Sequence, residues 1–496
     1  MSFDRASGIL LHPTSLPGPH GSGDFGTAAY HFVDWLVTAG QSLWQILPLG
    51  GIGPGNSPYM SSSAFAGNAL LIDLQALQEA GWLDRADLAP AADFDEQRLN
   101  FGVVVPWRMA RLQWAAERFH AGATPPQRDD FDAFCARHAG WLDDYALFMA
   151  LADAQGGRLW CDWAPLLARR DGAALAQARG EHAAAIVFWQ FCQWCFFRQW
   201  ERLKAYANGR GVRIVGDTPI FVAYQSADVW ARQELFELDA QGRPQVVAGV
   251  PPDYFSATGQ RWGNPLYRWD AHHAEAYAWW TERVRRTFDL VDIVRIDHFR
   301  GFVSYWEIPA EEPTAVIGRW VPGPGAALFQ AIESAFGDLP IIAEDLGVIT
   351  PEVDALRRRF GLPGMRVLQF AFGGDNDNTY LPHNYEPNTV VYGGTHDNNT
   401  STGWWLEASE AERSHACDYL ATDGQDMAWT LIRAACASVA DTAIHPLQDV
   451  LELGAECRMN LPGQGEGYWE WRFTWDQVLP EHAQRLKHFC DLYRRG

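Results

Sequence analysis

The prediction of the fold class rests on one stretch of the chain, Ile293-Val294-Arg295-Ile296-Asp297-His298-Phe299-Arg300-Gly301. It begins with a short β-branched run, as in a buried strand, and the run ends in a carboxylate before a glycine turn. In parallel α/β barrels the C-terminal strand ends carry the chemistry, and a guanidinium such as that of Arg295 keeps a neighbouring carboxylate ionised. We therefore predict that Asp297 is a nucleophile at a barrel mouth. A structural Asp–Arg pair at a strand end is the alternative interpretation.

Two further apolar runs end in acidic residues. Residues 339–343 lead into Glu344, and residues 389–395 lead into His396 and Asp397. The three acids Asp297, Glu344 and Asp397 are 47 and 53 residues apart, which leaves room for one or two βα units in each interval. All three can therefore converge on one barrel mouth.

The rest of the chain supplies the other strands of such a barrel. Apolar runs that break at Pro, Gly or polar residues predict strands at 8–16, 43–49, 212–221, 366–372 and 444–450. The fold class is thus α/β, a (β/α)8 TIM barrel with large, mainly helical insertions between strands. We expect the barrel at 1–50 and 212–496, a helical insertion at 51–211 with its clearest helices at 141–154 and 181–207, and a second insertion at 222–290.

Composition excludes several classes of partner. Lys and Arg number 39 against 61 Asp and Glu, a net charge of −22, and no basic cluster resembles a nucleic-acid footprint, so nucleic acid and anionic membrane surfaces are poor candidates. The N-terminus lacks a signal-peptide pattern and no apolar run reaches membrane-span length, which predicts a cytoplasmic protein.

Cys192 and Cys195 have redox or zinc spacing but lie within an aromatic helical run, which favours core packing. No metal cluster is apparent, so we expect no cofactor.

Three short motifs, in this order, resemble the catalytic segments of the α-amylase clan of retaining glycosidases: Arg295-x-Asp297, Ala343-Glu344-Asp345 and His396-Asp397-Asn398. Flanking residues narrow the resemblance to the 4-α-glucanotransferases called amylomaltase or disproportionating enzyme, and it covers nearly the whole chain. Its most discriminating segment is 248–267, a loop by its Pro and Gly content, which resembles the active-site lid of that family.

The resemblance implies an enzyme acting on α-1,4-glucans and maltooligosaccharides, with roles for particular residues. It implies that Asp297 is the nucleophile, that Glu344 is the general acid, and that Asp397 with His396 binds hydroxyls of the reacting sugar. Tyr254 and Phe255 would overhang the acceptor side. The full expected substrate-binding set is Arg295, His396, His298, Tyr59, Ser57, Asp217, Asp253, Tyr254, Phe255, Gln260 and Trp262, with no metal ligand.

Elementary electrostatics gives the same division of labour between the acids. Retaining glycosyl transfer needs two carboxyl groups about 5 to 5.5 Å apart, one attacking carbon and one donating a proton. Arg295 should lower the pKa of Asp297, whereas Glu344, on an apolar strand beside the anionic Asp345, should keep its proton.

What resolves the glycosyl-enzyme stays open at this point. Water would make the protein an α-glucan hydrolase, and the 4-hydroxyl of a second glucan would make it a transferase. An aromatic lid favours transfer because it excludes solvent. A non-catalytic glycogen-binding protein is the third possibility, and the oligomeric state stays open between a monomer and a weak homodimer.

Overall fold

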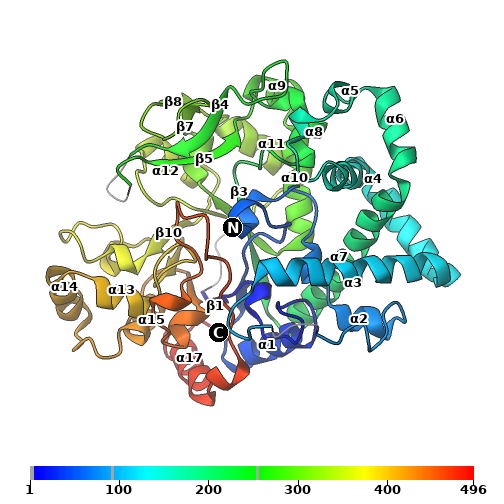
Figure 1. The fold of residues 1–496 in the computed structure, drawn as a ribbon. Helices are drawn as coiled ribbons and strands as arrows, with labels where there is room; N and C mark the ends of the chain where they lie inside the picture. Colours follow the sequence, from blue (N-terminus) through cyan, green and yellow to red (C-terminus); the bar gives the residue numbers. More distant parts are fainter. Residues whose placement is uncertain (1–4, 91–93, 253–255) are drawn as a thin grey trace.

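Eight parallel strands form a barrel in the computed structural model, which describes residues 5–90, 94–252 and 256–496 (Figure 1). The strands are β1 (Ala6–Leu10), β2 (Leu43–Gln45), β3 (Arg213–Pro219), β6 (Ile293–Asp297), β9 (Ile341–Ala343), β10 (Gly364–Val367), β11 (Thr389–Tyr392) and β12 (Thr442–Pro446). They pair in the order β10-β11-β12-β1-β2-β3-β6-β9. The Ala343 N–H donates to the Pro363 carbonyl at 2.9 Å, which links β9 to the start of β10. The predicted (β/α)8 fold class is therefore confirmed.

Several strands end earlier than the apolar runs that predicted them. The run 8–16 contains β1 only as far as Leu10, after which Pro13–Ser15 forms a 3-10 turn, and the run 43–49 contains the three-residue β2. The remaining apolar residues, such as Leu47 and Leu49, are buried as loop residues at the barrel mouth. An apolar run indicates that its residues are buried. Because buried residues continue beyond the last hydrogen bond of a strand, the run is longer than the strand itself.

Helices pack around the barrel because each presents one apolar face. On α11 (Ala326–Phe336), for example, Leu328, Phe329 and Ile332 are buried at helical spacing. The other helices between or after the barrel strands include α1 (Thr27–Thr38), α10 (Ala278–Leu290), α12 (Pro351–Arg359), α13 (Ser401–Glu407), α14 (Glu410–Leu420), α15 (Met427–Ala437), α16 (Leu447–Val450) and α17 (Pro480–Tyr493).

A mainly helical region follows β2 in the chain. It contains α2 (Leu74–Glu79), α3 (Phe101–Gly122), α4 (Pro125–Ala154), α5 (Pro165–Ala168), α6 (Gly172–Glu181) and α7 (Ala183–Gly209). Long α4 packs along α7, where Cys192 and Cys195 are both buried in an aromatic core, as expected. None of the helices formed by the described residues is long and apolar enough to cross a membrane.

A second, antiparallel sheet stands beside the barrel mouth in the order β5-β4-β7-β8 (Figure 1). Its strands are β4 (Val246–Val250), β5 (Gln260–Pro265), β7 (Ser304–Pro309) and β8 (Arg319–Pro322), and α8 (Ala227–Ala231) and α9 (Trp269–Ala274) flank it in the chain. The loop prediction for 248–267 was wrong at both ends of that segment. Gly249 belongs to β4 because its missing side chain lets the Gln260 carbonyl approach to 2.2 Å from an ideal Cβ position.

Candidate active site

Arg295 lies at the centre of the polar groups at the barrel mouth. Its side chain is buried, with Nη1 2.6 Å from Asp217 Oδ2 and Nη2 2.9 Å from Asp297 Oδ1. Strand register explains the first contact, because Asp217 on β3 pairs directly with Arg295 on β6. The Asp217 side chain is fully buried and also accepts a hydrogen bond from the Tyr59 hydroxyl at 3.0 Å. Asp217 thus orients Arg295 and Tyr59.

Glu344 is held next to the end of β6 by backbone groups. Its Oε2 accepts the His298 N–H at 2.7 Å, and its Oε1 accepts the Leu346 N–H at 2.8 Å. His298 directly follows Asp297 and has φ +55°, a left-handed conformation that turns the chain at the strand end. The loops after β6 and β9 therefore bring the carboxyl groups of Asp297 and Glu344 to one site.

Burial and mutual charge make Glu344 the proton carrier of this pair. Burial, followed by the negative charge of Asp297, raises the pKa of Glu344 to about 8. The sequence predicted a raised pKa for Glu344, but it attributed the effect to the charge of Asp345 and not to that of Asp297. The carboxylate of Asp345, the expected partner, instead accepts the buried Met365 N–H at 2.6 Å.

The expected direction for Asp297 was wrong. Burial raises its pKa above the ordinary value, although Arg295 opposes the shift and the side chain keeps 29% of its exposure. Neighbouring Asp217 and Asp397 add to the rise. The sequence already indicated Asp217 and Asp397 at the same mouth, but the prediction took only Arg295 into account and left out their negative charges and the enclosure around Asp297. Of the pair, Asp297 still carries the negative charge, because Arg295 is bonded to it directly while Glu344 receives only peptide N–H groups.

Asp397 is positioned by the C-terminal part of the chain. The Asn460 amide donates to Asp397 Oδ1 at 2.6 Å, and the Arg458 guanidinium donates to the Asp397 backbone carbonyl. His396 Nε2 lies 3.5 Å from Asp397 Oδ2 and 2.8 Å from the Tyr59 hydroxyl. Sequence reasoning gave Arg458 and Asn460 no role, because both lie about sixty residues after Asp397 in the chain.

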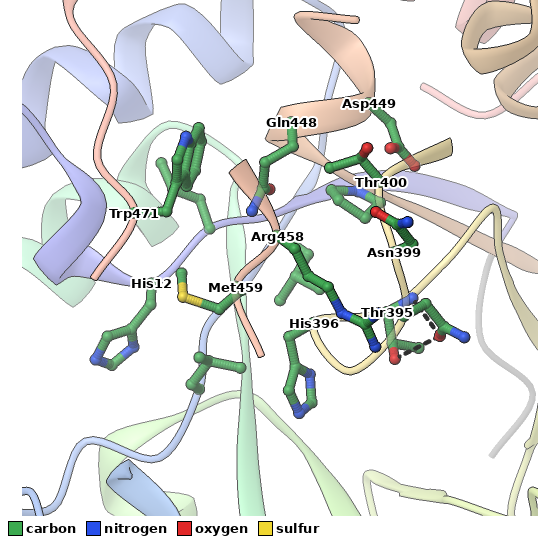
Figure 2. Close-up of a pocket in the computed structure, with 15 residues that line it drawn as sticks. His12, Thr395, His396, Asn399, Thr400, Gln448, Asp449, Arg458, Met459 and Trp471 are labelled. Atoms are coloured by element: carbon green, nitrogen blue, oxygen red, sulfur yellow. Dashed lines mark hydrogen bonds between the residues drawn. The ribbon is translucent and has the colours of Figure 1, made fainter. Parts of the chain in front are cut away.

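A small cavity of about 20 Å³ lies behind His396. Figure 2 shows the rings of His12 and His396 on either side of the Arg458 and Met459 segment. Burial, and then the neighbouring His396, lowers the pKa of His12 to about 3, so His12 is neutral. Sequence reasoning gave His12 no role, although its polar side chain directly follows the first strand.

The other expected substrate-binding residues that the structure describes also lie around the mouth. The Ser57 hydroxyl accepts the Tyr59 N–H at 3.2 Å and so fixes the turn that carries Tyr59. The Trp262 indole donates to Gln260 at 3.1 Å and meets the His298 ring edge-on at 4.9 Å. Outside the described residues lie Asp253, Tyr254 and Phe255.

Comparisons with known proteins agree along the whole chain. The family model described as 4-alpha-glucanotransferase matches residues 11–477. The chain is 51% identical over 503 residues to a 4-alpha-glucanotransferase of Thermus thermophilus, covering 100% of each, and 49% identical over 495 residues to one of Synechocystis sp., covering 99% of this chain and 98% of the relative. Its fold superposes on an amylomaltase from Streptococcus agalactiae in complex with acarbose with a TM-score of 0.96, at 38% identity over 99% of this chain and 100% of that one. With three strand-end acids at the mouth of a matching barrel, the chain belongs to the 4-alpha-glucanotransferase family.

Proposed function

We propose that this protein is a 4-α-glucanotransferase that moves α-1,4-glucan segments from a donor glucan to the 4-hydroxyl of an acceptor glucan or glucose. The observation that carries the proposal is the Asp297–Glu344 pair. One carboxylate is bonded to a buried guanidinium, and the other carboxyl group, with a pKa of about 8, is protonated at neutral pH. A charged nucleophile beside a neutral acid is the arrangement that retaining glycosyl transfer requires.

In the first step the Asp297 carboxylate attacks the anomeric carbon of the donor. The glycosidic C–O bond breaks, and Glu344 transfers its proton to the leaving oxygen, so that the shortened glucan departs as an alcohol. Asp397 and His396 bind the hydroxyls of the reacting sugar, contacts that strengthen as the ring flattens toward an oxocarbenium ion. Tyr59, held by Asp217 and stacked 5.5 Å from His396, supports the same sugar.

In the second step Glu344, now ionised, removes the proton from the acceptor 4-hydroxyl. The acceptor oxygen attacks the anomeric carbon and releases the Asp297 carboxylate, which restores both groups and retains the α configuration. Aromatic residues expected in the lid favour a sugar over water in this step because they displace solvent from the acceptor side. We place the activity in maltooligosaccharide, glycogen or starch metabolism.

Incubation with maltotriose alone tests the proposal against its alternatives. Each cleavage is matched by a transfer, so we expect glucose plus a ladder of longer maltooligosaccharides, with a nearly constant number of reducing ends. Chromatography with a reducing-end assay measures both. Reducing ends that rise steadily from the first time point would indicate an α-glucan hydrolase, and unchanged maltotriose would indicate a binding protein.

A further inference from the structure

Trp320 is a large aromatic side chain that the proposed reaction does not use and that remains 42% exposed. It lies on β8, one of the two edge strands of the small sheet, directly opposite Trp306 on β7. The two indole rings meet edge-on with their centres 5.3 Å apart. A large aromatic residue exposed on an edge strand promotes aggregation, so its presence there suggests that it binds a ligand or a partner.

Arg300 fixes the orientation of the Trp320 ring by packing against one of its faces. Its guanidinium carbon lies 3.9 Å from the centre of the ring, and the Arg300 residue is only 7% exposed. The same guanidinium donates to the Val348 carbonyl and, at 3.3 Å, to the Ser304 hydroxyl. One face of the indole is therefore packed on an immobilised cation, so that the exposed area of the ring is held in one orientation.

Arg300 also ties this ring to the reacting carboxyl groups. It follows Asp297 by three residues, and its partner Val348 follows Glu344 by four. Four residues of chain span at most about 14 Å, so Val348 lies within a few sugar units of the acid. Val348 is itself 69% exposed, and together Trp320 and Val348 form a surface that we call the outer rim.

The position of the outer rim favours the leaving-group side of the reaction. The general acid delivers its proton to the oxygen between the donor sugar and the leaving sugar, and the rim continues from the loop that follows Glu344. The hairpin between β7 and β8 also contacts the base of the lid, where the Ala315 N–H donates to the Thr258 carbonyl at 3.1 Å. Asp397 and His396, which hold the reacting sugar, are on a different strand end, after β11.

The chemistry of the rim fits a neutral sugar chain. An immobilised indole face matches the C–H face of a glucose ring, and such contacts cost little side-chain entropy because the ring is already held. We propose, on the basis of the proposed function, that Trp320 is an outer stacking platform for the acceptor glucan and makes the enzyme prefer longer acceptors.

Acceptor length tests this proposal. With α-maltosyl fluoride as donor, we would measure acceptor kcat/KM for glucose, maltose, maltotriose, maltopentaose and maltoheptaose by product chromatography. Trp320→Ala should lower the value about fivefold for the two longest acceptors and leave glucose unchanged. Trp320→Phe, which keeps a flat ring, should restore most of the loss.

Each other outcome overturns the proposal. An equal loss for glucose and maltoheptaose would mean that Trp320 is structural, and no loss at any length would remove the platform. If the loss of kcat/KM depended on the length of the donor and not on that of the acceptor, Trp320 would lie on the donor side of the site. A wild-type dimer that becomes a monomer in Trp320→Ala, by light scattering, would identify the rim as an interface between copies of this chain. Failure of the proposed function itself would look different, because the wild-type protein would then transfer glycosyl groups to no acceptor.

Discussion

At the scale of single residues, the site separates two similar carboxyl groups by their direct partners. Asp297 is bonded to the buried Arg295, whereas Glu344 is bonded to the peptide N–H groups of His298 and Leu346. Both pKa values are raised by burial, and the charge of Asp297 raises that of Glu344 further. The pair therefore holds one proton at neutral pH, on the group without the cation.

Replacing Glu344 with Gln tests this division directly. The variant lacks a proton donor, so transfer between natural glucans should slow by roughly 10²- to 10⁴-fold. An α-maltosyl fluoride should still glycosylate Asp297, because fluoride departs without protonation. The missing base then delays the second step, and intact-protein mass spectrometry should show one added maltosyl unit that peptide mapping places on Asp297.

Asp297→Ala is the matched control, since it has no nucleophile and should give no adduct with the same donor. Label found on Asp397 would reassign the nucleophile. An inverted product anomer would exclude a covalent intermediate.

The pKa of Glu344 predicts the alkaline limit of the reaction. A group that acts as an acid works only below its pKa, so kcat/KM for maltotriose should fall as the pH rises through about 8. At acidic pH the rate should also fall, because protonation of Asp297 removes the nucleophile. Glycosylation by α-maltosyl fluoride needs no acid and should lack the alkaline fall. If the fluoride donor shows the same alkaline fall, another group is responsible.

At the scale of elements, β4 and β5 of the small sheet lie on either side of the segment that we expect to form the lid. Gly259 lies just before β5 with φ +64°, and an ideal Cβ there would be 2.3 Å from the Val250 carbonyl and 2.9 Å from Ala315. Its N–H donates to the Ser256 carbonyl at 3.1 Å, which closes a tight turn. The turn before β5 thus accepts no side chain at this position.

Gly259→Ala should displace the base of the lid and admit water. We expect the ratio of hydrolysis to transfer, measured from reducing ends and the maltooligosaccharide ladder, to rise several-fold. Gly263→Ala is the matched control, because Gly263 also has a positive φ of +82° but meets no atom closer than 3.6 Å. Equal ratios in the two variants would mean that backbone strain, and not the clash at the lid base, produces any change.

At the scale of the whole molecule, the barrel is held together where the two ends of the chain meet. Arg495 is fully buried, and its guanidinium donates to the carbonyls of Cys436 at 2.7 Å and Ala6 at 3.1 Å. It also bonds to carbonyls in the segment 435–441, just before β12. Arg495 therefore connects the end of α17 to the neighbouring strands β1 and β12.

Arg495→Ala should lower the free energy of unfolding by about 2 to 4 kcal/mol, because several buried carbonyls lose a charged donor. Urea unfolding followed by tryptophan fluorescence measures the change. Arg494→Ala is the matched control, since Arg494 is exposed and should leave the midpoint nearly unchanged. Equal midpoints for the two variants would show that this cluster contributes little to stability.

The barrel and the places of its three strand-end acids follow from local patterns in the amino-acid sequence. Apolar runs ending in Asp297, Glu344 and Asp397 are local patterns, and the ends of parallel strands in a closed barrel must meet at one mouth. Helix α7 was also predictable, because its apolar residues recur at helical spacing, whereas the sequence indicated only the part of α4 from Trp141 onward, although the helix begins at Pro125.

The features that join distant parts of the chain became visible only in the folded protein. The small sheet pairs β4 with β7, about sixty residues later, and no local pattern specifies that partner. Asn460 reaches Asp397 from 63 residues away, and His12 approaches His396 from the other end of the chain. The raised pKa of Asp297 has the same origin, because burial and converging carboxylates depend on how the whole chain packs around a group, which its sequence neighbours do not reveal.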